Sequence, residues 1–145
     1  MNTSLSRPAA TRTKALFLGD LRTRPWAWAF QLVAAAILAQ TLFFKFSGAP
    51  ESVWIFEQLG VEPVGRLFAG LTELVCVLLL LWPRMALLGG LMTCGVMTGA
   101  LGAHVAVLGL EVQGDGGLLF GLALVTLVAG VGTVWTRRDQ LPRGW

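Results

Sequence analysis

The chain has 145 residues, of which 55% are hydrophobic and only 13% are charged. A soluble domain of this length needs a larger polar surface, so the composition excludes an ordinary soluble globular protein. A net charge of +3 would suit a nucleic-acid-binding protein, but most basic residues lie near the two ends of an otherwise apolar chain. The charge therefore reports membrane topology, and no nucleic-acid partner is expected.

Four apolar stretches are each long enough to cross a lipid bilayer. At a rise of about 1.5 Å per residue, roughly 18–25 residues cover a hydrocarbon core of ~30 Å. Only helices satisfy their own backbone groups in lipid, and the period-2 pattern of barrel strands is absent. The predicted fold is therefore all-α, a bundle of four transmembrane helices. The four spans run from about Trp26 to Phe44, from Val64 to Leu81, within Met85–Leu110 and from Gly117 to Trp135.

A short amphipathic segment separates the first two spans. Pro50 can open a helix over VWIFEQL and Gly60 can close it. We expect this helix to lie in the membrane interface or to cover the bundle as a lid. The chain then divides into a basic N-terminal tail (1–25), the membrane domain (26–135) and a C-terminal tail (136–145).

Lysine and arginine positions predict the orientation of the bundle. Nine basic residues lie in the two tails and in the turn between spans two and three, whereas Lys45 and Arg66 are the only two in the other connections. This distribution predicts that both termini are cytoplasmic.

Ionisable residues inside the spans mark the candidate site, because such groups are costly in hydrocarbon and are kept where they are paired or line a site. Glu73 lies about 14 Å and His104 about 9 Å from the outer surface, counted at 1.5 Å per residue. Lys45 ends span one, and Gln40 lies about 7 Å below it. The half nearer the cytoplasm is nearly without such groups. We therefore expect a polar pocket open to the outside, with Glu73 at its floor and His104 on its wall. Lys45, Arg66 and Asp115 are expected at its mouth.

Each candidate also has a structural interpretation. Glu73 can fix helix register by pairing with Arg66 or Lys45. His104 can hydrogen-bond a neighbouring helix, and Gln40 can do the same. Lys45 alone suits an interface anchor whose ammonium reaches toward water. Only their shared depth favours a ligand-binding or proton-relay site over these alternatives.

Small residues and cysteines are the remaining features. Gly95, Gly99 and Ala103 are spaced by four, and so are Gly117 and Gly121. We expect these small residues to let helices pack closely within the bundle. Whether the chain also forms a homo-oligomer is left undecided. Cys76 and Cys94 belong to no CxxC, so a redox pair is not assigned and no metal site is expected.

The order of these motifs resembles the DoxX family of small bacterial membrane proteins, over about Ala34 to Trp135. The matching pieces are FFKFSG (43–48), FEQLGVEP (56–63), GLTELVCVLLLLWPR (70–84), GAHVAV (102–107) and GDGG (114–117). The resemblance implies a four-helix bundle in the bacterial inner membrane, with Lys45, Glu73 and His104 at the family's polar positions.

The resemblance also implies several activities and leaves the function open. Family members are linked to thiosulfate:quinone oxidoreduction, to thiol-stress complexes and to assembly of other proteins. We expect an accessory or quinone-interacting subunit of a membrane oxidoreductase or thiol-stress complex, with no covalently bound cofactor and with a membrane or periplasmic partner protein. The alternative is a non-catalytic assembly factor or interaction protein. Whether the chain is an enzyme at all is left undecided.

Overall fold

The structure, a computed structural model, describes residues 9–141, and these residues form helices and no strand. The predicted all-α four-helix bundle is confirmed. Each of the four long helices is long and apolar enough to cross a membrane, so this is a multi-pass membrane protein. They are α2 (Pro25–Ser47), α4 (Val64–Leu81), α5 (Ala86–Ala103), which continues into the π-helix η1 (His104–Leu108), and α6 (Leu118–Thr136).

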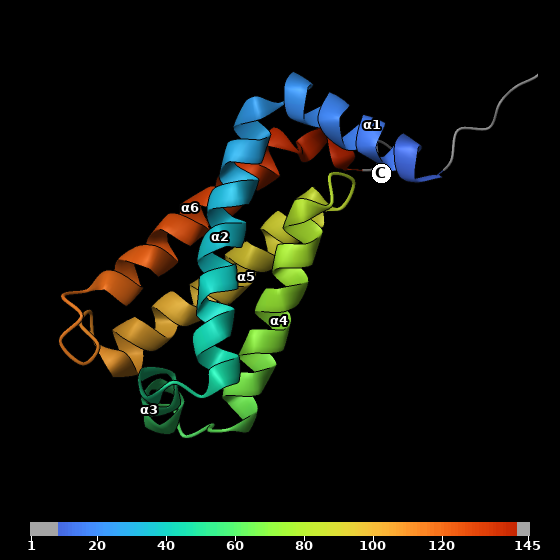
Figure 1. Cartoon of the computed structure of the whole chain (residues 1–145). Helices are drawn as coiled ribbons and strands as arrows, with labels where there is room; N and C mark the ends of the chain where they lie inside the picture. The colour runs from blue at the N-terminus through green and yellow to red at the C-terminus, as the bar shows by residue number, and fades with distance from the viewer. Residues whose placement is uncertain (1–8, 142–145) are drawn as a thin grey trace, which may run out of the picture.

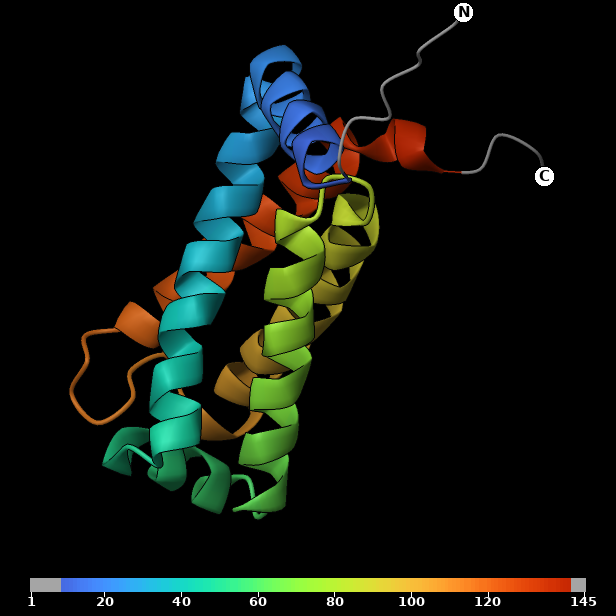
Figure 2. The same ribbon diagram turned by 45° about the vertical axis from the view of Figure 1, so that its right-hand side comes forward.

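The four long helices form a closed ring in which each packs against two neighbours (Figures 1 and 2). Helix α2 lies against α4 and α6, and α5 lies against the same two, so α2 and α5 face each other across the bundle. The centre is filled by small and aliphatic side chains, among them Ala34, Leu38 and Leu80. Side chains on the outside of the ring are large and apolar, as a lipid-facing surface requires.

Shorter helices cover the two ends of the bundle (Figure 1). One end, called here the terminal end, carries α1 (Ala9–Thr23), the turn between α4 and α5, and the short helix η2 (Arg138–Gln140). The other, called here the far end, carries α3 (Pro50–Gln58) and the loop 109–117. Thus much of the basic N-terminal segment is helical, and both ends of the described chain lie at the terminal end.

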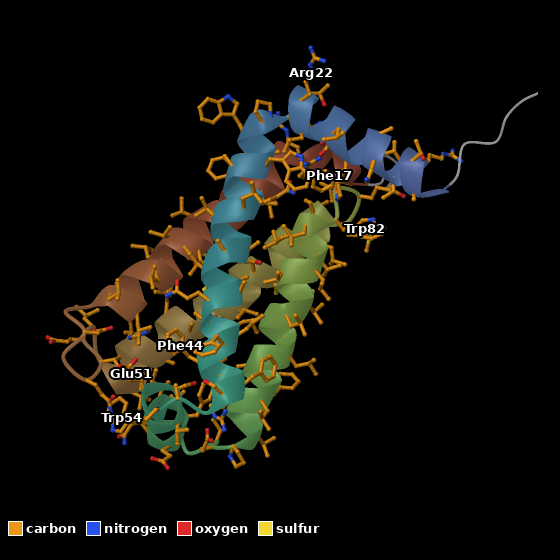
Figure 3. All side chains as sticks on the ribbon, viewed as in Figure 1. Phe17, Arg22, Phe44, Glu51, Trp54 and Trp82 are labelled. Carbon is orange, nitrogen blue, oxygen red and sulfur yellow. The ribbon has the colours of Figure 1, made fainter. Side chains whose placement is uncertain are left out.

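Helix α3 is the short helix expected between the first two spans. A left-handed glycine, Gly48 with φ 67°, ends α2 and donates its N–H to the carbonyl of Phe44. Pro50 then occupies the first turn of α3. The sharp turn lays α3 across the far end, where it contacts η1 (Figure 2). Figure 3 shows two of its side chains, Glu51 and Trp54, at this end of the molecule.

The glycine stripes do not pack as expected. A Cβ added to Gly95, Gly99 or Gly121 would meet no atom within 4 Å, so the prediction of internal packing is wrong for these residues. The close approach occurs elsewhere, and a Cβ on Gly89 would lie 2.7 Å from the backbone nitrogen of Leu80. Small residues recur at similar spacing on both faces of α5. The sequence alone therefore does not indicate which of these faces contacts a neighbouring helix.

Candidate functional site

Glu73 and Lys45 form a buried ion pair at the far half of the bundle. Lys45 Nζ, from the last turn of α2, lies 3.0 Å from Oε2 of Glu73 on α4. The hydroxyl of Thr41 donates to the same oxygen at 2.8 Å. Glu73 is only 5% exposed, and its Oε1 accepts no hydrogen bond from residues 9–141. The carboxylate is therefore held through one oxygen and retains acceptor capacity on the other.

Arg66 belongs to a neighbouring ion pair and does not bind Glu73. Its guanidinium makes a 2.8 Å ion pair with Glu62, four residues earlier, and its Nε donates to both carboxylate oxygens. A further N–H of Arg66 donates to the backbone carbonyl of Lys45. Arg66 thus joins the start of α4 to the end of α2 and positions the residue that pairs with Glu73.

His104 is oriented by a change in helix geometry. At His104 the α-helix α5 gives way to the π-helix η1, a feature often found at functional sites. Its Nδ1 lies 2.8 Å from the carbonyl oxygen of Gly109, and the ring meets Phe120 edge-on at 5.6 Å between centroids. In the neutral ring, Nδ1 donates to that carbonyl and Nε2 is left as an acceptor. Nε2 has no hydrogen-bond partner among the described residues.

Asp115 organises the loop between η1 and α6. Its carboxylate accepts hydrogen bonds of 2.8–2.9 Å from the backbone N–H groups of Leu119, Val112 and Gly117. These bonds, led by that of Leu119, lower the pKa of Asp115 below its ordinary value of 3.8. Asp115 therefore fixes the backbone of the loop that joins η1 to the start of α6.

We expect these hydrogen bonds to make stability depend on acid pH. Because the pKa of Asp115 is lower in the folded chain, its contribution is present above pH 3.8 and is lost as the pH falls below that value. Asp115→Asn should melt earlier than wild type at neutral pH and show a shallower loss in acid. Thermal unfolding between neutral pH and pH 3 measures this. Glu111→Gln, an exposed change in the same loop, should keep the wild-type slope; equal slopes for Asp115→Asn and wild type would contradict the prediction.

Gln40 lies apart from the other candidates. Its side chain is exposed and makes no hydrogen bond within residues 9–141. The adjacent Thr41 is the residue that reaches Glu73, and Glu62 is the partner of Arg66; the sequence interpretation named neither. Both had a usable signal in their spacing. Thr41 precedes Lys45 by four residues on one face of α2, and Glu62, in the turn before α4, precedes Arg66 by the same number.

A second polar cluster, absent from the predicted site, is buried toward the terminal end. Arg137, 1% exposed, donates from two nitrogens to Asp20 of α1 at 2.8 and 2.6 Å. Its Nε donates to Gln31 at 2.8 Å, and Gln31 donates in turn to the carbonyl of Leu80. Trp28 donates to Asp20 as well. The expectation that this half lacks polar groups is therefore wrong, and the cluster ties α1 to α2, α4 and the end of α6.

Thiols and other metal-ligating groups are dispersed. No three His, Cys, Asp or Glu side chains converge as a metal site within residues 9–141. Cys76 and Cys94 are both free, the first buried against the core and the second half-buried. The far half thus offers ion-paired and hydrogen-bonding groups, with Glu73, Lys45 and His104 as its chemically versatile members.

Comparison of the chain with protein-family models, with curated proteins and with solved structures finds no match.

Proposed function

We propose that this chain is a DoxX-like membrane subunit that binds the head group of a quinone and acts beside a partner oxidoreductase in the membrane or periplasm. The observation that carries the proposal is the Lys45–Glu73 ion pair, buried within a bundle whose outer surface is apolar. A quinone requires an apolar path for its tail and polar groups at its carbonyl oxygens; the apolar outer surface and the ion pair support these two requirements.

Each residue of the cluster would have a defined part. Lys45 would donate a hydrogen bond to one quinone oxygen and stabilise the negative charge that forms on reduction. Glu73, with Oε1 unengaged, would exchange a proton with an oxygen of the quinone head group. His104 would accept a hydrogen bond from a hydroquinone at Nε2, because its Nδ1 is held by Gly109. Electrons would come from the partner protein, since the chain itself would supply only binding and proton exchange.

The proposed setting is the bacterial inner membrane, with the terminal end in the cytoplasm. Seven of the described basic residues lie at the terminal end and two at the far end, a distribution that favours this orientation. The quinone site would then open toward the periplasmic side. The seven are Arg12, Lys14, Arg22, Arg24, Arg84, Arg137 and Arg138.

A quinone titration tests the proposal. The full chain in detergent would be titrated with the hydroquinone form of a short-chain ubiquinone analogue, and quenching of the chain's tryptophan fluorescence would be recorded. We expect saturable binding that weakens about tenfold in both Glu73→Gln and His104→Gln, as loss of one hydrogen bond to a charged or oriented group predicts. Glu57→Gln, an exposed carboxylate on α3, is the matched control and should bind as wild type does.

The two variants guard against different failures. Glu73→Gln removes the partner of Lys45 and can destabilise the fold, whereas His104 belongs to no ion pair among residues 9–141, so His104→Gln leaves the ion pairs intact. Absence of saturable binding, or equal affinity in wild type and in folded His104→Gln and Glu73→Gln, would overturn the proposal.

A second candidate function is supported by the open glycine face of α5. A Cβ on Gly95, Gly99 or Gly102 would meet no atom within 4 Å, so another helix could approach the backbone closely there. Such a face suits a non-catalytic assembly factor that holds a partner's membrane helix. Lack of quinone binding, together with stoichiometric co-purification of a partner that is lost in Gly99→Leu, would favour this function over the first.

A further inference from the structure

A hollow with polar and apolar walls lies at the terminal end, where α2 begins and α6 ends. It is lined by residues of both helices and of the segments that flank them, and it is separate from the Glu73 cluster. Two tryptophans, Trp26 and Trp135, and two arginines, Arg24 and Arg138, contribute to its walls. The two helices pack directly against each other at this end of the bundle (Figures 1 and 2).

The arginines of this hollow differ in their pairing. Arg24 is engaged by Asp139 through two hydrogen bonds of 2.7 and 2.8 Å, so the positive charge that Arg24 brings to the wall is neutralised. The guanidinium of Arg138 lies 4.6 Å from the centre of the Trp135 ring, and no carboxylate in residues 9–141 pairs with it. Asp20, another acidic residue at this end of the molecule, is held by Arg137. The hollow therefore carries one uncompensated positive charge, oriented by an aromatic ring.

The surroundings place this charge at the edge of the lipid. Trp26 and Trp135 are 76% and 68% exposed and lie where the apolar helices end, as tryptophans do at the head-group level of a bilayer. An exposed apolar track continues from Trp135 along one face of α6, through Val131, Val128 and Leu124 at spacings of four, three and four residues. A ligand with an anionic head and a long apolar tail matches both parts.

We propose that this hollow binds an anionic phospholipid of the surrounding bilayer, such as phosphatidylglycerol. The phosphate lies against the guanidinium of Arg138 between the two tryptophans, and an acyl chain follows the track on α6. The planar guanidinium donates two hydrogen bonds to phosphate oxygens, which a zwitterionic lipid with its compensating ammonium engages less strongly. The inference requires a membrane but does not depend on the quinone site.

Lipid titration followed by native mass spectrometry tests this site. The full chain would be stripped of lipid in detergent and titrated with phosphatidylglycerol or with phosphatidylcholine of the same acyl chains. We expect tighter binding of phosphatidylglycerol, and about tenfold weaker binding in Arg138→Gln. Arg84→Gln is the matched control, because it removes the same charge from an exposed residue at the same end but outside the hollow; its affinity should stay within about twofold of wild type.

Three results would overturn the inference. Equal affinity for the two lipids would show that the head-group charge is not recognised. Equal losses in Arg84→Gln and Arg138→Gln would show only diffuse attraction to a basic surface. Displacement of the lipid by millimolar inorganic phosphate would identify a site for free anions. Because the side chain of Arg138 is exposed, the variant should fold, and an unchanged melting temperature checks this.

Discussion

Asp20→Asn is expected to destabilise the protein by about 3 kcal/mol, because it leaves the buried guanidinium of Arg137 without a counter-charge. The side chain of Arg137 is 2% exposed, and Asp20 supplies both the charge and two short hydrogen bonds. Asparagine keeps the shape but can accept through only one oxygen. The loss corresponds to a fall in melting temperature of roughly 6–12 °C for a chain of this length, measured by thermal unfolding in detergent.

Asp139→Asn provides the matched control for this prediction. It makes the same chemical change at the same end of the molecule, but the Arg24–Asp139 pair is solvent-exposed at 38% and 40%. Exposed pairs contribute about 0–1 kcal/mol, so its melting temperature should change little. If the two variants lose equal stability, burial does not increase the contribution of the Asp20–Arg137 pair to stability. Helix α1 would then be held by other contacts.

The fold could be predicted because hydrophobic length is a local property of the chain. The span expected from Val64 to Leu81 is the helix found, and the first span is longer than expected by one residue at its start and three at its end. The helical conformation of α1 was not predicted. Its only acidic residue, Asp20, is also the only acid before Glu51, and that isolation was the available signal for a specific partner.

The candidate site could be predicted in depth but not in direction around the helix. Counting residues placed Gln40 and Lys45 near each other in depth, yet five residues of helix turn a side chain about 140° away. Thr41, four residues before Lys45, shares its face and therefore reaches Glu73. Pairings such as Arg137 with Gln31 join residues 106 positions apart, and no local pattern indicates them.

The Lys45–Glu73 pair should show strong coupling in a double-mutant cycle. Lys45→Met and Glu73→Gln are each expected to lower the free energy of unfolding by about 3–5 kcal/mol. Each substitution leaves the charge of the other residue unpaired inside an apolar bundle. The double variant should lose at least about 2 kcal/mol less than the sum of the singles, since it removes both charges together. Thermal unfolding of the four proteins measures the coupling. The same cycle at the exposed Arg24–Asp139 pair is the control, and its coupling should be below about 1 kcal/mol.

The double variant also separates the two interpretations of the far-half cluster. If the pair only fixes helix register, a stable Lys45→Met/Glu73→Gln protein should keep every other property of the molecule, including any affinity for a quinone analogue. If the pair serves a ligand, the double variant should fold and still fail to bind, because the ammonium that donates to a carbonyl oxygen and the carboxylate that exchanges protons are both gone. Additive losses in the cycle would contradict direct pairing, and unchanged quinone affinity in the stable double variant would assign Lys45 and Glu73 to the architecture alone.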